Sequence, residues 1–226
     1  MNKPYIECIS LNKQYRRKQR IIHAVRDINL QLEKGEFVLL KGKSGAGKST
    51  LLNLIGGLIN PTSGTVRIDE RIVHELDNAS LCDLLLNTVG IIFQSLNLLP
   101  TYTVYENIEV ALAPKGLSGN EIQKMIIPCF EQFKLSDTLH YLPEELSVGQ
   151  QQKVAIIRTL VKRPSIILAD EPTASVDEET ADEIIRYLRD LRDERNVTVI
   201  LATHGIVSDN MADRIIAVEN GSIVPL

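Results

Sequence analysis

Glycine, lysine and hydroxyl residues cluster in one short segment, GKSGAGKST, at residues 42–50. The spacing is that of a loop that cradles phosphate groups: Gly42, four further residues, and then Gly47-Lys48-Ser49. Glycine tolerates positive φ, so such a loop can turn its backbone N–H groups inward around phosphate oxygens. Lys48 would reach the β- and γ-phosphates, and the Ser49 hydroxyl would ligate Mg²⁺. A nucleoside triphosphate is the expected ligand, and its expected binding residues are Gly42, Lys43, Ser44, Gly45, Ala46, Gly47, Lys48, Ser49 and Thr50.

Two adjacent carboxylates follow the apolar run SIILA much later in the chain. Asp170 would close a buried strand, where its carboxylate can hold Mg²⁺ directly or through water. Glu171 comes next and can polarise the attacking water. Two acids at the end of a strand would, in isolation, simply be solvated. Beside a phosphate loop, they supply the two carboxylate functions that phosphoryl transfer to water requires.

Apolar patterning around these residues predicts the elements that position them. The run FVLL precedes the glycine-rich segment, and a helix is predicted from Lys48 to Gly56. The N-terminal segments YIECISL and INLQLEKGEFVLL read as strands, and ENGS near the C-terminus predicts a hairpin turn. Strands over SIILAD and VTVILAT flank a helix predicted at residues 178–195. Buried strands alternating with helices predict an α/β fold with a mainly parallel sheet.

The middle of the chain has a different character. From about residue 97 to residue 163 strand signals disappear, and apolar residues recur at helical spacing. We therefore predict an inserted α-helical subdomain at about residues 95–163. It would interrupt a core formed by about residues 1–94 and 164–226, and together these parts form a single domain spanning residues 1–226.

The segment ELSVGQQQKVAII carries a specific resemblance. It resembles the signature motif of the ATP-binding-cassette (ABC) ATPases, whose usual form is Leu-Ser-Gly-Gly-Gln. Ser147, Gly149 and Gln150 match it at the start of a predicted helix, where a hydroxyl and backbone N–H groups suit a γ-phosphate. The resemblance implies ATP and Mg²⁺ as ligands. It also implies that the phosphate belongs to the ATP of a second subunit, so that two chains form a head-to-tail homodimer.

The resemblance covers the chain almost end to end and gives roles to three more residues. Gln94 resembles the Q-loop glutamine that contacts Mg²⁺ or the attacking water, and His204 resembles the switch histidine at the γ-phosphate. Tyr15 resembles the aromatic residue that stacks on adenine, although packing at a sheet edge would explain it as well. Residues 174–177 resemble the D-loop that crosses the dimer interface.

The implied fold is a P-loop NTPase of ABC type, with a RecA-like core, an N-terminal antiparallel β subdomain and the inserted helical subdomain. The activity implied is ATP hydrolysis. The implied sites are catalytic Glu171, His204, Lys48 and Gln94, and the metal ligands Ser49, Gln94 and Asp170.

Three positions depart from the family pattern. Val148 replaces the first signature glycine, so a contact or backbone angle that only glycine supports would be lost there. Lys153 stands where the family often has arginine, which keeps the charge without the bidentate fork. Gly205 follows the switch histidine where aspartate is common. We expect activity to survive, because Ser147 and Gly149 remain in the signature, and the other two changes leave Lys48 and both carboxylates in place.

Composition limits the partners and the compartment. The net charge of −4 and the pI near 5.6 argue against nucleic acid as the main partner. Three scattered cysteines, with no Cys-x-x-Cys pair, fit a reducing compartment. The N-terminus lacks the apolar segment of a signal peptide, and no apolar run approaches the length of a membrane span. We expect a cytoplasmic chain, peripheral on the inner face of the cell membrane.

The segments FQSLNLLPTYTVYENIEVAL and ILADEPTASVD resemble the macrolide-export and lipoprotein-release type of ABC ATPase. That type implies a separate membrane permease that is moved by closure of the ATPase dimer. The apolar segment at residues 96–105 is a candidate surface for that partner, with packing between the two subdomains as the alternative. A regulatory ATPase of the cell-division type, which signals through a membrane partner without transport, would carry the same motifs. A soluble ABC ATPase of DNA repair or translation fits less well, because the chain has one cassette and no basic surplus.

Overall fold

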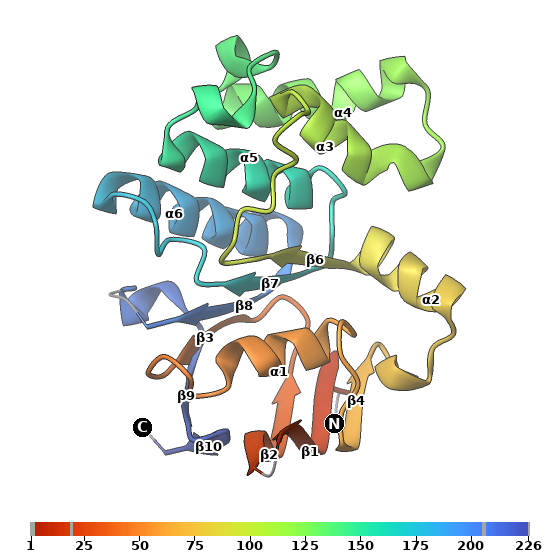
Figure 1. Ribbon diagram of the computed structural model, residues 1–226, viewed down its shortest axis with the longest axis vertical. Coiled ribbons are helices and arrows are strands. Elements are labelled where there is room, and N and C mark those ends of the chain that lie inside the picture. Colours follow the sequence, from red (N-terminus) through yellow and green to blue (C-terminus); the bar gives the residue numbers. More distant parts are fainter. Residues whose placement is uncertain (1–2, 19, 205–206, 226) are drawn as a thin grey trace.

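The computed structural model describes residues 3–18, 20–204 and 207–225, and two sheets organise it (Figure 1). The larger sheet consists, in spatial order, of β10 (Ser222–Val224), β9 (Arg214–Glu219), β3 (Phe37–Lys41), β8 (Thr198–Thr203), β7 (Ile166–Asp170) and β6 (Val89–Ile92). All neighbours from β9 to β6 are parallel, and only β10 runs antiparallel, at the edge. Strands β3, β7 and β8 are buried almost throughout, as expected of parallel strands covered on both faces.

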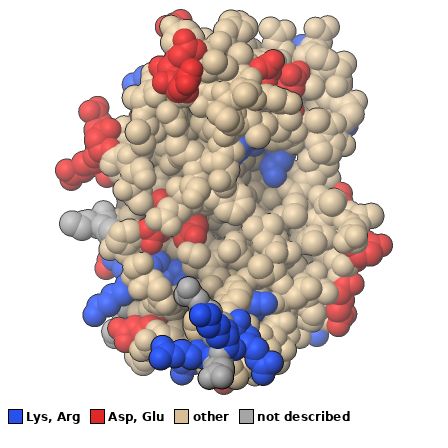
Figure 2. All heavy atoms as spheres, viewed as in Figure 1, with Lys and Arg blue, Asp and Glu red and all other residues tan. Residues whose placement is uncertain are grey.

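The smaller sheet is antiparallel and forms the N-terminal subdomain. Its strands, in spatial order, are β2 (Arg20–Leu32), β1 (Ile6–Arg17), β4 (Ser63–Ile68) and β5 (Arg71–Ile72). Along β2, buried and exposed residues alternate towards the C-terminal end of the strand, because one face packs on the core and the other meets solvent. Figure 2 shows Lys and Arg side chains gathered at the lower end of the molecule, where the β1–β2 hairpin lies.

The described residues also form six α-helices. They are α1 (Lys48–Ile55), α2 (Asn78–Asp83), α3 (Val104–Leu112), α4 (Gly119–Gln132), α5 (Val148–Leu160) and α6 (Glu178–Arg195). A π-helical turn (Leu84–Thr88) continues α2, and short 3₁₀ turns occur at Val73–Glu75, Ala113–Lys115, Ser136–Thr138, Pro143–Glu145 and Asp209–Met211. None of the helices that the structure describes has the length and hydropathy needed to cross a membrane.

The large sheet separates two hydrophobic cores. Phe37 and Leu39 of β3 face the core formed with α3 to α6, whereas Val38 and Leu40 face the core formed with α1 and the smaller sheet. This alternation follows from the two-residue period of a strand. Figure 1 shows α6 between the sheet and the upper helices, and α1 on the opposite side.

Helices α3, α4 and α5 form the insertion between β6 and β7. Each begins at a hydroxyl N-cap with an acid or amide three residues later: Thr103 with Glu106, Ser118 with Glu121, and Ser147 with Gln150. Within the described residues no strand lies between β6 and β7. The expected mainly parallel core, antiparallel β subdomain and inserted helices are therefore confirmed, while the subdomain boundaries at residues 95 and 163 stay a prediction.

Candidate nucleotide-binding and hydrolysis site

The glycine-rich loop joins β3 to α1 and ends in an uncapped helix N-terminus. Gly47 is the N-cap of α1, with φ of 108° and no side-chain capping bond. A Cβ at this position would lie 2.2 Å from the carbonyl oxygen of Ala24 in β2, so both the backbone angle and the space require glycine. The first N–H groups of α1 have no side-chain cap and can receive an anion.

Lys48 lies beneath this loop and is only 4% exposed. Its ammonium donates to the carbonyl oxygens of Gly42, at 2.7 Å, and Lys43, at 3.3 Å. Ala46 accepts a hydrogen bond from the N–H of Gly221 in the β9–β10 turn, at 2.8 Å. The loop is thus stabilised by two contacts, one from the Lys48 side chain and one from the β9–β10 hairpin. This hairpin is the one predicted from the ENGS segment. Nothing in the sequence pattern indicated that this hairpin would support the phosphate loop.

Asp170 and Glu171 lie at the carboxyl end of β7, as predicted. Oδ1 of Asp170 is buried and has no hydrogen-bond partner. Burial raises the pKa of the Asp170 carboxyl, and the neighbouring Glu171 adds to the effect; a hydrogen bond from Ser49 and the charge of Lys48 act the other way. Such an unpartnered buried oxygen next to a serine hydroxyl fits a hard cation, which prefers oxygen ligands.

Glu171 is held in an unusual backbone conformation. Its φ is 49°, in the left-handed region that residues other than glycine rarely occupy. Its N–H donates to the carbonyl oxygen of Ala202 in β8, at 2.9 Å, which extends the β7–β8 ladder past the end of the strand. Strain of this kind persists only where the surroundings fix it, and it commonly occurs at functional sites.

Three side chains from other elements converge on the Glu171 carboxylate. Nδ1 of His204, just after β8, lies 2.6 Å from Oε2. Nε2 of Gln94, just after β6, lies 3.5 Å from the same oxygen. Nζ of Lys48 lies 3.7 Å from Oε1. The carboxyl ends of parallel strands meet at one sheet edge, which is why residues so distant in sequence come together here.

The signature segment lies apart from this cluster. The Ser147 hydroxyl accepts the N–H of Gln150, at 3.3 Å, and caps α5. A cavity of about 320 Å³ at this helix start is lined by Ser147, Val148, Gly149, Gln150, Lys153, Ser175, Val176, Asp177 and Thr180. Its lining contains residues of the predicted D-loop and none of the phosphate loop. The signature therefore does not serve the phosphate loop of its own chain in this structure.

Val148 and Lys153 can now be described, whereas Gly205 lies outside the described residues. Val148 is the first residue of α5, has no positive φ, and is 51% exposed. Hence no glycine-only backbone angle is needed at this position of this chain. Nζ of Lys153 forms an ion pair with Oε2 of Glu183 in α6, at 2.6 Å.

Tyr15 lies near the end of β1, half exposed, with the Lys13 ammonium 5.3 Å from the centre of its ring. It pairs with Ile22 of β2. Ala24, two residues further along β2, packs against Gly47 of the phosphate loop. Tyr15 is therefore on the strand pair that borders the loop, which is compatible with the adenine role.

Two residues that sequence reasoning missed hold the segment after Gln94. Asn107 is fully buried; its Nδ2 donates to the carbonyl oxygens of Leu99, Tyr102 and Thr103, each at 3.0 Å, and its Oδ1 accepts the N–H of Leu99, at 2.7 Å. A polar residue on the apolar stripe of a predicted helix was the available signal. Arg158 donates to the carbonyl oxygens of residues 96 and 97, at 2.8 and 2.7 Å, and nothing in its sequence context indicated this role.

A phosphate loop, a strand ending in two carboxylates and a histidine from the next strand, all at one edge of a parallel sheet, define a P-loop nucleoside triphosphatase. Residues 25–174, more than half of the chain, match the family model described as "ABC transporter". The chain thus belongs to the ABC transporter ATP-binding family and is an ATP-binding ATPase cassette.

Individual relatives agree with this assignment. The chain is 39% identical over 222 residues to the ABC transporter ATP-binding protein MJ0796 of Methanocaldococcus jannaschii, covering 96% of this chain and 94% of that protein. It is also 39% identical over 219 residues to the macrolide export ATP-binding/permease protein MacB of Salmonella typhimurium, covering 97% of this chain but only 34% of MacB. The dimeric structure of MJ0796 in a post-hydrolysis state, bound to ADP and Pi, superposes with a TM-score of 0.92 at 38% identity, covering 97% of both chains.

Proposed function

We propose that this chain is the ATP-hydrolysing subunit that drives a separate membrane permease, either for export or for transmission of force across the membrane. The observation that carries the proposal is the convergence of Lys48, Gln94 and His204 on Glu171. A permease as the partner is supported by the likeness to MacB, whose name is that of an ATP-binding/permease protein. The chain would then act in the cytoplasm, peripheral to the inner face of the cell membrane.

The nucleotide would occupy the phosphate loop, Gly42 to Thr50, with Tyr15 stacked on the adenine. The uncapped start of α1 and the buried Lys48 ammonium provide positive potential for the phosphates. Ser49, Gln94 and Asp170 would hold Mg²⁺, for which the unpartnered Oδ1 of Asp170 is the main support. When bound, Mg²⁺ would supply charge neutralisation on the phosphate oxygens.

Glu171 would orient and deprotonate the attacking water. Its carboxylate is held by the Nδ1 of His204 and lies near the Lys48 ammonium, so its position is fixed before the nucleotide arrives. Lys48 and His204 would then stabilise the charge that builds on the transferred phosphoryl group. Gln94, whose amide lies near the Glu171 carboxylate, would contact the attacking water and link the two subdomains.

A second copy of the chain would complete each site. The signature cavity has no phosphate-loop residue in its lining, so Ser147, Gly149 and Gln150 are available to the γ-phosphate of a partner. The Ser147 hydroxyl accepts a hydrogen bond from its own helix, which leaves its proton free to be donated. The solved MJ0796 cassette is also described as dimeric. We therefore propose a head-to-tail homodimer with two ATP molecules at its interface.

The permease would contact the segment at residues 96–105. Asn107 and Arg158 fix the backbone of this segment, while Leu99 and Tyr102 keep 39% and 42% of their surfaces exposed. Apolar side chains on a rigid, exposed segment are typical of a surface that is covered by a partner.

Co-purification tests the proposal. The chain would be expressed with the membrane protein encoded beside it, captured by a tag on the chain, and assayed for ATP hydrolysis with and without that partner. Stable capture with partner-dependent turnover is the expected result. Vigorous hydrolysis by the chain alone, with no membrane protein captured, would indicate a soluble ABC ATPase. Capture of a partner whose outer domain acts on cell-wall hydrolases would instead indicate the regulatory cell-division type.

A further inference from the structure

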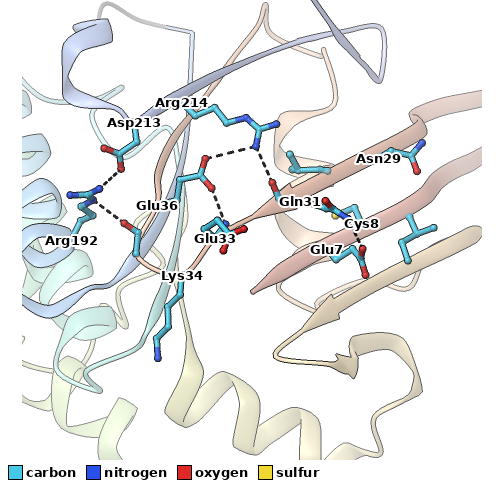
Figure 3. A pocket seen from close by; sticks show the side chains of 13 residues that line it. Glu7, Cys8, Asn29, Gln31, Glu33, Lys34, Glu36, Arg192, Asp213 and Arg214 are labelled. Atoms are coloured by element: carbon cyan, nitrogen blue, oxygen red, sulfur yellow. Dashed lines mark hydrogen bonds and ion pairs between the residues drawn. The ribbon is translucent and has the colours of Figure 1, made fainter. Parts of the chain in front are cut away.

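A large cavity lies between the β subdomain and the core, and the charged side chains in its wall pair with one another. Figure 3 shows that its two arginines are both engaged. Arg192 donates to the carbonyl oxygen of Gly35, at 2.8 Å, and pairs with Asp213, at 3.0 Å. Arg214 donates to the carbonyl oxygen of Gln31, at 2.9 Å, and lies 3.8 Å from Glu36. Both guanidiniums already have partners within the chain. They therefore connect the β subdomain to the core and leave few free donors for a ligand.

A second cavity, of about 390 Å³, lies between α4, the turn after α5, and α6; we call it the lobe cavity. It is lined by Met125, Pro128, Cys129, Gln132, Leu160, Val161, Arg163, Pro164, Ser165, Ile167, Tyr187, Leu191, Arg195 and Val197. Leu160, Val161, Ile167, Leu191 and Val197 form a buried apolar part of this wall. The volume falls within the range of small-molecule sites, about 300–1,000 Å³.

The polar groups of the lobe cavity are cationic or neutral. No Asp or Glu occurs among the described lining residues. Arg163 and Arg195 are exposed at its mouth, and neither guanidinium has an ion pair or hydrogen bond with another described residue. Both are close enough to Cys129 to act on its thiol, lowering a pKa that burial raises. The two unpaired cations therefore face a common region beside an apolar wall.

Tyr187 adds a third donor. Burial raises the pKa of its hydroxyl to about 12, and the charges of Glu194 and Asp190 add to the effect. Like any tyrosine hydroxyl, this group is protonated at neutral pH. Its ring is fixed by an edge-on contact with Phe133, with the ring centres 4.7 Å apart. The hydroxyl has no hydrogen-bond partner among the described residues.

The lobe cavity is separate from the hydrolysis site. It borders β7 at Ile167, near the beginning of the strand, whereas Asp170 and Glu171 lie at its other end. Its walls come from α4 of the helical insertion and from α6 and β7 of the core. A molecule bound here would touch both subdomains without touching the nucleotide.

We propose that the lobe cavity binds a small amphipathic carboxylate, with its apolar body against Leu160, Ile167 and Leu191 and its carboxylate at Arg163 and Arg195. Arginine suits this task because its planar fork of donors matches a carboxylate. The Tyr187 hydroxyl provides a further hydrogen-bond donor for an oxygen of the bound molecule. This site does not depend on the proposed permease or on dimer formation.

Decanoate, below its micelle concentration, is a suitable probe for the full chain. Calorimetric titration and thermal unfolding would compare it with decan-1-ol and decylammonium, which have the same chain length and a neutral or positive head. We expect saturable binding of decanoate and a raised Tm, a smaller effect of the alcohol, and none of the ammonium. Equal effects of decanoate and decylammonium would overturn the proposal, as would failure of decanoate to bind at about millimolar concentration.

A double substitution, Arg163→Gln with Arg195→Gln, separates the site from general detergent binding. Both side chains are exposed, so the fold and the ATP hydrolysis of the unliganded chain should be unchanged. Decanoate affinity should fall about tenfold or more, while the effect of decanol is retained. Arg186→Gln, on the same helix but outside the cavity lining, is the matched control and should bind decanoate like the parent chain. Undiminished decanoate binding by the double variant would rule out this site.

Discussion

Nδ1 of His204 lies 2.6 Å from Oε2 of Glu171, and the two residues follow adjacent parallel strands. The histidine therefore positions the carboxylate in addition to any contact it makes with a γ-phosphate. This relationship makes the two side chains one functional unit, whose members should not contribute independently to turnover.

We expect His204→Ala to lower ATP hydrolysis by about 10–100-fold in the parent chain, because the carboxylate loses its nearest partner. In a Glu171→Gln background the same substitution should cost little more, since the group that His204 positions is already lost. Steady-state ATPase assays of the parent, both single variants and the double variant measure the coupling. Losses that simply multiply in the double variant would contradict the positioning role.

Replacement of Glu171 by glutamine should reduce turnover by about 10²–10⁴-fold, because the amide cannot accept a proton from water. ATP binding should persist, since the phosphate loop is intact, and the chain should accumulate as an ATP-bound dimer. Turnover and nucleotide binding would be measured in parallel. Glu179→Gln is the control: this glutamate is exposed at the start of α6, and its loss should leave turnover unchanged. Full activity in the Glu171 variant would sink the catalytic assignment.

Asp170→Asn should stabilise the nucleotide-free chain while abolishing Mg²⁺-dependent hydrolysis. Because burial raises the pKa of Asp170, its charged form opposes folding once the pH exceeds the carboxyl's ordinary value, and the full cost is present above the raised pKa. The variant should thus gain Tm at pH 8, by about 2–4 °C for a gain of about 1 kcal/mol. The gain should shrink as the pH falls through the raised pKa, because the parent carboxyl then becomes protonated. A variant that is less stable than the parent at pH 8 would show that the buried charge is already compensated.

Val148→Asp should weaken ATP-dependent dimerisation. Val148 is half exposed at the signature cavity, where a partner's phosphate is expected, and a carboxylate there would repel it. Size-exclusion chromatography with ATP, in the Glu171→Gln background, would report the dimer. Val110→Asp, at an exposed position on α3 outside this cavity, should dimerise normally. Equal dimer fractions in the two aspartate variants would argue against a phosphate at the signature.

Asn107→Leu tests the segment at residues 96–105. The substitution leaves several backbone groups of this segment without partners, so we expect a loss of about 2 kcal/mol of stability or more. Partner-stimulated hydrolysis should fall more than basal hydrolysis, because the exposed Leu99 and Tyr102 lose their fixed positions. Asn120→Leu, exposed on α4, is the control. If the Asn107 variant keeps full stimulation by the permease, the partner binds elsewhere.

Much of this site could be predicted because its residues follow the ends of apolar strands. The positions of Lys48, Asp170 and Glu171 follow from local sequence. Lys48 comes after an apolar strand and a glycine-rich loop, and the two carboxylates come at the end of another apolar strand. The order of the strands is not local, and the sequence alone did not show that β6, β7 and β8 are neighbours. That order is what brings Gln94 and His204 to the same carboxylate.

Other contacts depended on tertiary packing and could not be predicted. Gly221 donates a hydrogen bond to Ala46, and Arg158 donates to residues 96 and 97. These bonds join segments far apart in sequence. Their acceptors are backbone carbonyl oxygens, which every residue has, so no residue type indicates them. The lobe cavity likewise forms only where α4 meets α6. At Val148, a family comparison suggested a lost glycine angle, whereas the helical backbone at this position accepts valine.

The helical insertion leaves the sheet after β6 and returns at β7, and these two strands are hydrogen-bonded neighbours, with Val89 opposite Ile166 and Ile92 opposite Ala169. The spacing of the hydrolytic residues is therefore set by the ladder and not by the length of chain between the strands. This arrangement makes the insertion an exchangeable module. Changes in α3, α4 and their loops would leave the ends of β6 and β7 in register, and with them the hydrolytic residues, provided that Ser147 still caps α5.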